Sequence, residues 1–474
     1  GGFQLLDLHD FPGQWTSLVG ILDAFWDSKG LINPAEWRRF CSPSVPLLRL
    51  TKRVWGNDET LTADAELAHF GPTGLKAAEA TWRITDATGA ELAKGSFSPR
   101  DLPRGELSAL GSISYSLKQV REPSQLRIEV SVPAAGAVND WLVWVYPRVV
   151  ADKPSDAVIA TTWEEAKAGL AAGRKVLLLA GGCLREPVVT RFEVPFWNPL
   201  MFKGQPHTFG QVIDPKHPAL ALFPSAAHND WQWSEPLTGA KSIVLDSLPR
   251  ELKPIVASID SLDTCRRLAN LFEARVGTGR LLVSGYDLRR NLDKRPAAEA
   301  LRRSSLAYMA GPAFDPRVAL TVDQLDTVFG PNLLTVVPSA PTDGLLLSVR
   351  AATASAQPNT NYDWEPKLDR VDHREAGFDY KVTQGQTWLD ATGSSWHHNE
   401  EVKLQVTCPK GFTGRLYLFL WDWNRLGRAA AVRYEGRTLG TLDEYDGDGK
   451  WVAIPVTAAV PTAAAGRQGA RPRA

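Results

Sequence analysis

The pattern of hydrophobic and polar positions changes several times along the chain, and each change marks a predicted domain. Residues 1–45 open with Phe3–Asp10, which is apolar on both faces and turns polar at its end. That pattern is typical of a buried parallel strand with polar groups at its exit. Asn33 and Pro34 predict a helix start, with Asn as the cap and Pro at the first helical position.

Residues 46–150 alternate between apolar and polar positions, and Gly, Pro and Asp turns separate the segments. The pattern predicts an antiparallel β-sandwich, with strands at Thr60–Leu67, Ala80–Ile84, Gln125–Val132 and Trp141–Val145.

Residues 151–312 alternate between strand and helix patterns, which predicts a layered α/β domain with a mainly parallel sheet. Strands are expected at Val158–Ala160, Lys175–Ala180, Ser242–Leu245 and Arg280–Ser284. A helix is expected at Thr162–Ala172, with Thr162 as its cap and Gly173 at its close. A second helix is expected where four residues fall at i, i+3, i+4 and i+7, namely Cys265, Leu268, Ala269 and Phe272.

The last part of the chain reads as a linker, a β-rich domain and a tail. Residues 313–365 are predicted to be a linker. Residues 366–456 are β-rich, and Leu416–Trp423 is apolar on both faces, as in a central sandwich strand. Residues 457–474 are rich in Ala, Gly, Arg and Pro, and we expect them to be disordered.

Composition narrows the class of protein. With 474 residues, about three domains are expected. Lys and Arg total 53, as do Asp and Glu, so neither a nucleic-acid partner nor a polyelectrolyte tail is indicated. No apolar run is long enough for a membrane span. The four cysteines form no CxxC pair, so no metal site or disulfide framework follows. The 17 tryptophans suit large sandwich cores or flat platforms that stack on sugars.

The densest polar cluster follows the first predicted strand. It comprises Asp7, His9, Asp10, Gln14 and Trp15. Carboxylates and imidazole bond sugar hydroxyls, and an indole stacks on a sugar ring, so the cluster suits a carbohydrate site. A strand end with merely solvated polar groups is the competing interpretation.

Gly1-Gly2-Phe3 through Asp7-Leu8-His9-Asp10-Phe11 resembles the last barrel strand of the glycoside hydrolase family 2 clan, the beta-galactosidase and beta-glucuronidase relatives. One residue is inserted relative to that pattern, and Leu6 stands where Trp is usual. Gly20–Leu31 resembles the rim segment that follows the strand. Since Gly1 opens directly into an apolar segment, we expect the chain to begin inside a domain.

Later motifs resemble long family 2-like proteins of bacterial polysaccharide degraders: Phe196-Trp197-Asn198-Pro199, Asp230-Trp231-Gln232-Trp233 and Trp421-Asp422-Trp423-Asn424. The resemblance implies a multidomain α+β chain. It would comprise the end of a TIM barrel (1–45), an immunoglobulin-like β-sandwich (46–150), a glutamine-amidotransferase-like α/β domain (151–312) and a carbohydrate-binding-module-like β jelly-roll (366–456).

The resemblance further implies a retaining glycosidase with two catalytic Glu residues. No Glu of this chain matches either motif, so no catalytic residue is assigned. The implied substrate-binding residues are Asp7, His9, Asp10, Gln14, Trp15 and Trp26, although Trp26 also suits a core position. A carbohydrate substrate, a secreted or periplasmic location and no cofactor are implied, and a homo-oligomer through the α/β domain is allowed. The alternative function is a non-catalytic carbohydrate-binding or structural accessory protein.

Weaker constellations each have a plain structural interpretation. Cys183 follows a predicted strand, with His207, His217 and His228 downstream as bases, but a buried thiol is the simpler reading. Asp230–Trp233 suits either a sugar cleft or domain packing. His397 and His398 point apart on a strand, which disfavours a metal. Asp443, Asp446 and Asp448 suit calcium or a plain polar turn.

Overall fold

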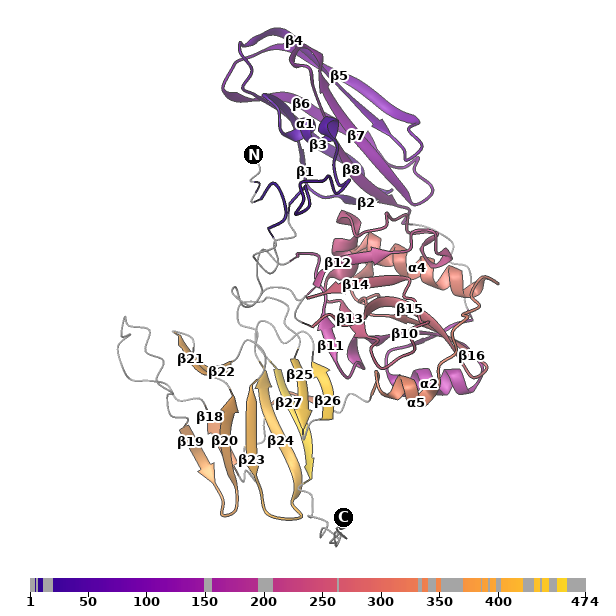
Figure 1. Cartoon of the computed structure of the whole chain (residues 1–474), viewed down its shortest axis with the longest axis vertical. Coiled ribbons are helices and arrows are strands. Elements are labelled where there is room, and N and C mark those ends of the chain that lie inside the picture. The colour runs from indigo at the N-terminus through magenta and orange to yellow at the C-terminus, as the bar shows by residue number, and fades with distance from the viewer. Residues whose placement is uncertain are drawn as a thin grey trace, which may run out of the picture. The chain divides into compact units, whose positions relative to one another are not determined.

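The computed structural model divides the chain into two compact units. The first comprises residues 1–332 and 435–441, and the second comprises residues 333–434 and 442–474. Most elements are strands and few are helices, so the chain has a multidomain α+β fold (Figure 1). The structure describes residues 5, 7–11, 20–148, 156–194, 208–261, 264–330, 335–339, 347–350, 370–384, 386–390, 393–397, 402–420, 430–434, 437–442 and 450–457.

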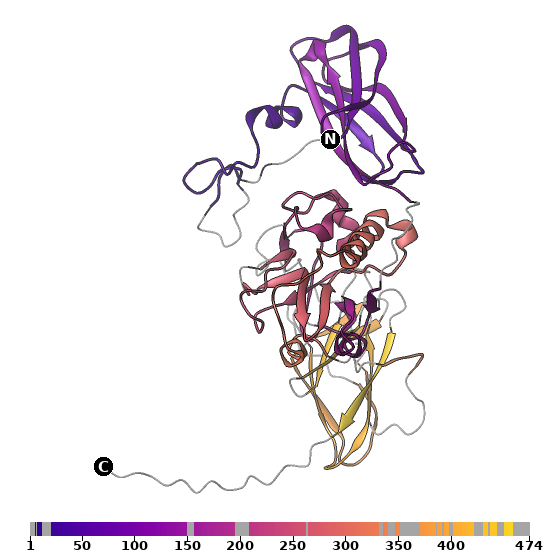
Figure 2. The ribbon, with the colours of Figure 1, turned by 90° about the vertical axis from the view of Figure 1, so that its right-hand side faces the viewer.

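The N-terminal segment that precedes the first sheet ends in the short helix α1 (Pro34–Phe40), shown with its preceding loop in Figure 2. The side chain of Asn33 accepts from the backbone N–H groups of Ala35 and Glu36, and the Glu36 carboxylate accepts from the N–H of Asn33. This reciprocal cap confirms the predicted helix start. Phe3, Gln4 and Leu6 of the expected barrel strand lie outside the described residues, and the described residues before Leu31 pair through isolated bridges, His9 with Leu22 and Leu22 with Ser28.

Residues 44–146 form a β-sandwich, as predicted. Alternate side chains of both sheets face one core, which contains Leu61 and Ile113 from one sheet and Ile84 and Val130 from the other. The strands pair antiparallel except β2 with β8, which are parallel. One sheet has the order β1 (Ser44–Leu50), β3 (Thr60–His69), β6 (Glu106–Ser116). The other has the order β2 (Val54–Gly56), β8 (Ala137–Tyr146), β7 (Ser124–Val132), β4 (Leu75–Thr85), β5 (Glu91–Leu102). The 3₁₀ turn η1 (Pro133–Ala135) connects β7 to β8.

Residues 158–330 form an α/β layered domain around an eight-stranded sheet. Its main path is β11 (Pro187–Val189), β13 (Lys241–Val244), β15 (Leu268–Val276), β16 (Gly279–Ser284), β10 (Lys175–Leu179), β9 (Val158–Ala160). Off this path, β14 (Val256–Asp260) pairs with β15 and with β12 (Thr208–Ile213). The predicted strands at β9, β10, β13 and β16 are confirmed.

Two predictions for this domain were wrong. The sheet is not mainly parallel, because only β9, β10 and β16 run parallel and the other described pairs are antiparallel. Three of the four residues of the predicted helix, Leu268, Ala269 and Phe272, lie in strand β15, and Cys265 precedes that strand. Nearly every residue of β15 is buried, so its apolar positions follow no period of two and match a helical spacing by coincidence.

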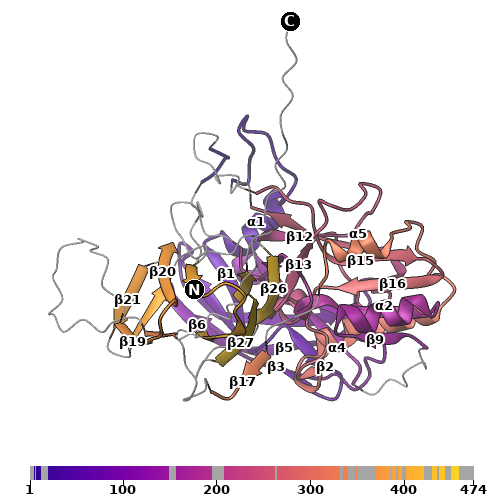
Figure 3. The same ribbon diagram turned by 90° about the horizontal axis from the view of Figure 1, so that it is seen from below.

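Helices cover both faces of this sheet (Figure 3). Val176 and Leu178 of β10 face the core that includes α2 (Trp163–Ala171). Leu177 and Leu179 face the core that includes α4 (Pro296–Ala310). The helix predicted at Thr162–Ala172 is confirmed, with its Thr162 cap and a left-handed Gly173 after its end. The other short elements are η2 (Ala180–Gly182), η3 (Pro218–Leu220), η4 (Trp231–Trp233), α3 (Ser234–Leu237), η5 (Leu292–Lys294) and α5 (Val322–Asp326).

The α/β domain extends beyond residue 312, where the linker was expected to begin. Phe314 packs in the core on the α4 face, and Leu320, Leu325 and Phe329 pack in the core on the α2 face. Residues 331–334, 340–346 and 351–365 of the expected linker lie outside the described residues.

The described residues from 335 onward are β-rich. A three-stranded sheet has β27 (Lys450–Thr457) between β17 (Thr335–Val337) and β24 (Thr413–Leu420). Leu416–Leu420 of the predicted central strand belong to β24, which is at the end of this sheet among the described strands, and residues 421–423 lie outside the described residues. The remaining pairs are β18 (Leu347–Arg350) with β19 (Arg370–Arg374), β20 (Asp379–Gln384) with β23 (Lys403–Thr407), β21 (Gln386–Asp390) with β22 (Gly393–His397), and β25 (Ala430–Tyr434) with β26 (Arg437–Leu442). Thr457, the first residue of the predicted disordered tail, is the last residue of β27, and residues 458–474 lie outside the described residues.

Candidate functional site

The candidate site lies where two stretches of the N-terminal segment, residues 7–11 and 20–29, contact each other. The N–H of Asp10 donates to the carbonyl of Leu22 at 3.0 Å, and the N–H of Leu22 donates to the carbonyl of Leu8 at 3.1 Å. Gly20 permits this approach, because a Cβ at that position would lie 2.3 Å from the carbonyl carbon of His9. Any other residue would push the two stretches apart.

The Asp10 carboxylate also holds these two stretches of chain together. Asp10 is 7% exposed, and its Oδ1 accepts from the Gly20 N–H at 3.0 Å and from Lys29 Nζ at 2.6 Å. A buried carboxylate is costly unless it is paired and hydrogen-bonded. Asp10 therefore links the strand-like residues to both ends of the segment 20–29.

Between Gly20 and Lys29, a tight turn at residues 23–27 contains Trp26. The Asp23 carboxylate accepts from the N–H groups of Phe25 at 2.8 Å and Asp27 at 2.9 Å. The Trp26 N–H donates to the Asp23 carbonyl at 3.1 Å. These bonds hold Trp26 at a φ of 70°, in the left-handed region that bulky residues seldom adopt.

The indole of Trp26 lies against the imidazole of His9, with ring centroids 4.3 Å apart and planes inclined by 35°. The indole is nevertheless exposed, because Trp26 retains 60% of its accessible surface. His9 Nδ1 lies 2.7 Å from the carbonyl oxygen of Asp10. Since a carbonyl oxygen only accepts, Nδ1 carries the proton, and Nε2 is the acceptor in the neutral ring.

The structure brings together His9, Asp10 and Trp26 of the six predicted substrate-binding residues. Asp7 is half-buried on the same stretch. Gln14 and Trp15 lie outside the described residues. Trp26 was expected to suit either the core or a pocket, and its exposure excludes a core position within the described fold.

Three residues that build the site were not singled out from the sequence: Gly20, Asp23 and Lys29. Gly20 and Lys29 act through contacts with a segment ten or more residues away, so no local pattern marks them. Asp23 had a local signal, because an Asp that bonds backbone N–H groups two and four residues later is a common turn former.

Cys183 is unsuited to nucleophilic chemistry. It is 4% exposed, and burial raises the pKa of its thiol to about 12, to which Glu164 also contributes. A thiol with that pKa is not a thiolate at neutral pH. Cys183 also packs on the α2 face, whereas His217 contacts Tyr308 on the α4 face. His207 lies outside the described residues, and the plain reading of a buried thiol is supported.

The other candidate groups add no site. In Asp230–Trp233, the ring of Trp233 is fully buried, as domain packing requires. His398 and its acidic neighbours Glu400 and Glu401, which would complete a metal site there, lie outside the described residues, as does the Asp443–Asp448 turn. Among the residues that the structure describes, no group of three or more His, Cys, Asp or Glu is placed to hold a metal. Within the same residues, no helix is long and apolar enough to cross a membrane.

Two family models match single domains of this chain. Residues 59–147 match a domain of unknown function, DUF8488, and residues 158–330 match a domain of unknown function, DUF8487. The first range corresponds to the sandwich from β3 to β8, and the second to the α/β domain. A search of curated proteins found no match.

Solved structures with local similarity include glycoside hydrolases, at low coverage. A beta-glucuronidase of Parabacteroides merdae is 10% identical over 29% of this chain and 21% of that chain, with a TM-score of 0.18. A family 123 glycoside hydrolase of Clostridium perfringens is 7% identical over 29% of this chain and 38% of that chain, with a TM-score of 0.18. A CARDB domain of Pyrococcus furiosus is 14% identical over 22% of this chain and 86% of that chain, with a TM-score of 0.18. Scores this low carry no argument about fold or activity.

Proposed function

We propose that this chain is the C-terminal portion of a retaining glycoside hydrolase acting on poly- or oligosaccharide, and that it contributes part of the substrate pocket. The observation that carries the proposal is Trp26, an exposed indole held in a left-handed backbone conformation beside His9. The family 2 resemblance of residues 1–31 supports the same assignment.

The conformation of Trp26 has a free-energy cost that folding alone does not require. A non-glycine residue in the left-handed region costs about 1–2 kcal/mol, and such strain concentrates at binding sites. Burial of the indole does not offset the cost, because Trp26 is 60% exposed. A binding role accounts for both features, since a sugar ring that stacks on the indole removes it from water.

Polar groups beside the indole suit hydroxyl recognition. His9 Nε2 accepts a hydrogen bond when the ring is neutral, and the half-buried Asp7 supplies a carboxylate on the same stretch. Asp10 acts differently, because its Oδ1 is occupied by Gly20 and Lys29. We therefore assign Asp10 to positioning His9, and His9, Asp7 and Trp26 to contact with the sugar.

No catalytic carboxylate is assigned to this chain. Retaining enzymes use two carboxylates about 5–5.5 Å apart, as acid/base and nucleophile. The proposed contribution of residues 7–26 is to hold a sugar unit, so that hydrolysis depends on groups outside this set.

Calorimetric titration of the chain with a panel of neutral oligosaccharides tests the proposal. We expect at least one sugar to bind, and Trp26→Ala to weaken its binding about tenfold, the loss that follows from removing about 1.4 kcal/mol of stacking and apolar contact. Trp231→Ala is the matched control, because Trp231 is similarly exposed, at 51%, but lies in the α/β domain. Equal losses in the two variants, or no binding of any sugar, would contradict the proposal.

The second candidate function is a non-catalytic carbohydrate-binding accessory protein. The same Trp26 platform favours it, because stacking needs no catalytic group. Aryl glycoside hydrolysis by this chain and by a version extended at its N-terminus separates the two. Hydrolysis by the extended version supports the enzyme, whereas sugar binding without hydrolysis in both supports the accessory role.

A further inference from the structure

We propose that a hollow on the outer face of the five-stranded sandwich sheet binds the carboxylate of an acidic sugar. The hollow has a volume of about 370 Å³, within the roughly 300–1,000 Å³ of small-molecule sites. Its lining combines two arginines, a glutamine, a hairpin turn and one apolar side chain, in the set Arg83, Thr85, Asp86, Ala87, Thr88, Gly89, Gln125, Arg127 and Leu142.

Cross-strand register brings these side chains together. Arg127 on β7 is opposite Thr85 on β4 and opposite Leu142 on β8. Arg83 on β4 lies two residues before Thr85 and therefore projects from the same face. The turn after β4, residues 86–89, closes one end of the hollow.

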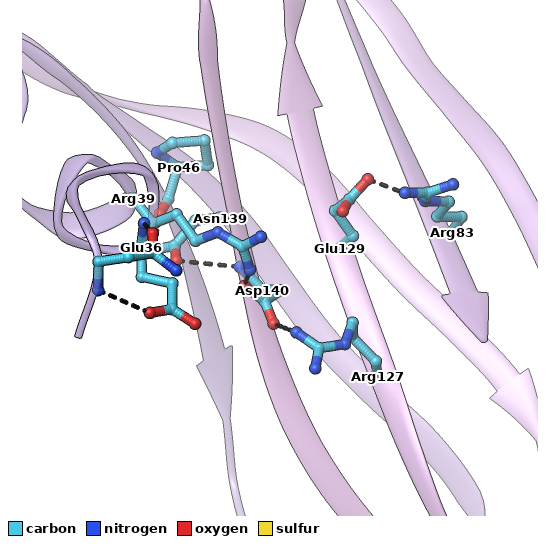
Figure 4. Close-up of polar contacts among 9 residues, drawn as sticks. Glu36, Arg39, Pro46, Arg83, Arg127, Glu129, Asn139 and Asp140 are labelled. Carbon is cyan, nitrogen blue, oxygen red and sulfur yellow. Dashed lines mark hydrogen bonds and ion pairs between the residues drawn. The ribbon is translucent and has the colours of Figure 1, made fainter. Parts of the chain in front are cut away.

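Each of the two arginines forms an ion pair with a carboxylate of the same sheet (Figure 4). Arg83 donates through Nε to Glu129 at 2.8 Å. Arg127 donates through one terminal nitrogen to Asp140, which also accepts from Arg39 of α1. A guanidinium has five N–H donors. Among the hydrogen bonds of the described residues, the other N–H groups of Arg83 and Arg127 are uncommitted, so each fork is oriented yet keeps donors for a ligand.

One carboxylate oxygen of the lining, Oδ1 of Asp86, is occupied. Oδ1 of Asp86 accepts from the Thr88 N–H at 2.8 Å, from the Thr88 hydroxyl at 2.6 Å and from the Ala90 N–H at 3.0 Å. The lining therefore offers an excess of donors, from Arg83, Arg127 and the Gln125 amide. A carboxylate is the complementary ligand group, because it accepts bidentate bonds from guanidinium forks.

Charge balance sets the strength of this interaction. Glu129, Asp140 and the Asp86 carboxylate of the lining offset the positive charge of the arginines at long range, so attraction acts mainly over hydrogen-bond distance. Leu142 supplies an apolar contact for a ring carried by the carboxylate. The choice of a sugar as carrier rests on the proposed function, whereas the preference for a carboxylate rests on the arginines alone.

The experiment is a calorimetric titration of the full chain with trigalacturonate and with its methyl ester, which has the same sugars without the charges. We expect trigalacturonate to bind about tenfold or more tightly than the ester. We expect Arg127→Gln and Arg83→Gln each to weaken trigalacturonate binding about tenfold, the effect of losing one charge-assisted pair. Arg49→Gln is the matched control, because Arg49 also pairs with a glutamate on an exposed sandwich face, Glu66 on the other sheet.

Trp26→Ala separates this site from the proposed pocket, since it should leave trigalacturonate binding at the hollow unchanged. Equal affinity for acid and ester, an equal loss in Arg49→Gln, or no binding of trigalacturonate overturns the proposal. Arginine modification by phenylglyoxal, mapped by mass spectrometry on the unaltered chain, is a test that needs no variant. Trigalacturonate should protect Arg83 and Arg127 but not Arg49, and protection of all three or of none counts against the hollow.

Discussion

At the scale of single residues, two nearly buried carboxylates organise the chain around them. Asp10 holds Gly20 and Lys29, and Asp260 holds Thr264 and Arg266. A buried charge with several hydrogen bonds is tolerated, but removal of one partner leaves a desolvated group unpaired. Local order at both places should therefore depend on single side chains.

Lys29→Met should loosen the candidate site without unfolding the rest of the chain. The substitution leaves the Asp10 carboxylate with the Gly20 N–H as its remaining described partner, at a cost of about 1–3 kcal/mol. Hydrogen exchange at Gly20 and Leu22 should become about tenfold or more faster. Lys76→Met is the control, because the Lys76–Asp101 pair is exposed to solvent, where such pairs contribute little to stability. Unchanged exchange at both amides would show that Asp10 does not hold this segment.

Asp260 should make the α/β domain sensitive to acid. Burial alone would raise the pKa of Asp260, but hydrogen bonds from Arg266 and Thr264 outweigh it and lower the pKa below its ordinary value. Because the folded-state pKa is lower than the unfolded one, the stabilisation is full above the unfolded pKa of about 3.9 and is lost as the pH falls through the folded pKa.

Asp260→Asn tests this dependence. We expect the variant to be less stable than the unaltered chain at pH 7, by about 1–3 kcal/mol, and the difference to shrink toward pH 2. Urea unfolding of the α/β domain at both pH values measures it. A difference that stays constant across this pH range would mean that the carboxylate charge is not the stabilising feature.

At the scale of elements, strand β15 shows where sequence patterns fail, and helix α2 and strand β10 show where they succeed. Elements with local signals were predicted well, such as α2 with its Thr162 cap and the buried run of β10. β15 is buried on both faces, so the alternation that identifies a strand is absent. Its antiparallel pairing with β16 depends on contacts between chain segments, which no local pattern encodes.

The candidate site shows the same difference between residues with a local sequence signal and residues that act through distant contacts. His9 and Asp10 stand out in the sequence as polar residues after an apolar run. Their partners do not, because Gly20 acts by lacking a Cβ and Lys29 acts across 19 residues of chain. The exposure of Trp26 follows from a turn made by Asp23, which the hydrophobic pattern does not show.

Phe272→Ala should strongly destabilise the α/β domain. Phe272 is fully buried in the core on the α2 face, and deletion of such a ring costs about 3–5 kcal/mol. Urea unfolding followed by hydrogen exchange in residues 268–284 measures the loss. Phe70→Ala, at a site that is 63% exposed, should change stability by no more than about 0.5 kcal/mol. A loss below 1 kcal/mol for Phe272→Ala would contradict the assignment of β15 as a central strand.

At the scale of the whole molecule, the sandwich and the α/β domain share part of one hydrophobic core. The sandwich has a core of its own and the α/β domain has one on each face of its sheet, but the core on the α4 face also contains Val54, Trp144 and Tyr146 of the sandwich. The two family models match the sandwich and the α/β domain separately. The proposed sugar contacts lie before both modules, in the segment that contains Trp26.

The central claim is that Trp26 stacks on a sugar, and fluorine NMR of the chain labelled with 5-fluorotryptophan tests it most directly. Trp26→Phe identifies the Trp26 resonance as the one that disappears, and Trp144, which is 1% exposed, provides a buried reference. Addition of an oligosaccharide that binds should shift the Trp26 resonance and leave that of Trp144 unchanged. A sugar that binds while the Trp26 resonance stays in place would contradict the account and place the carbohydrate site elsewhere in the chain.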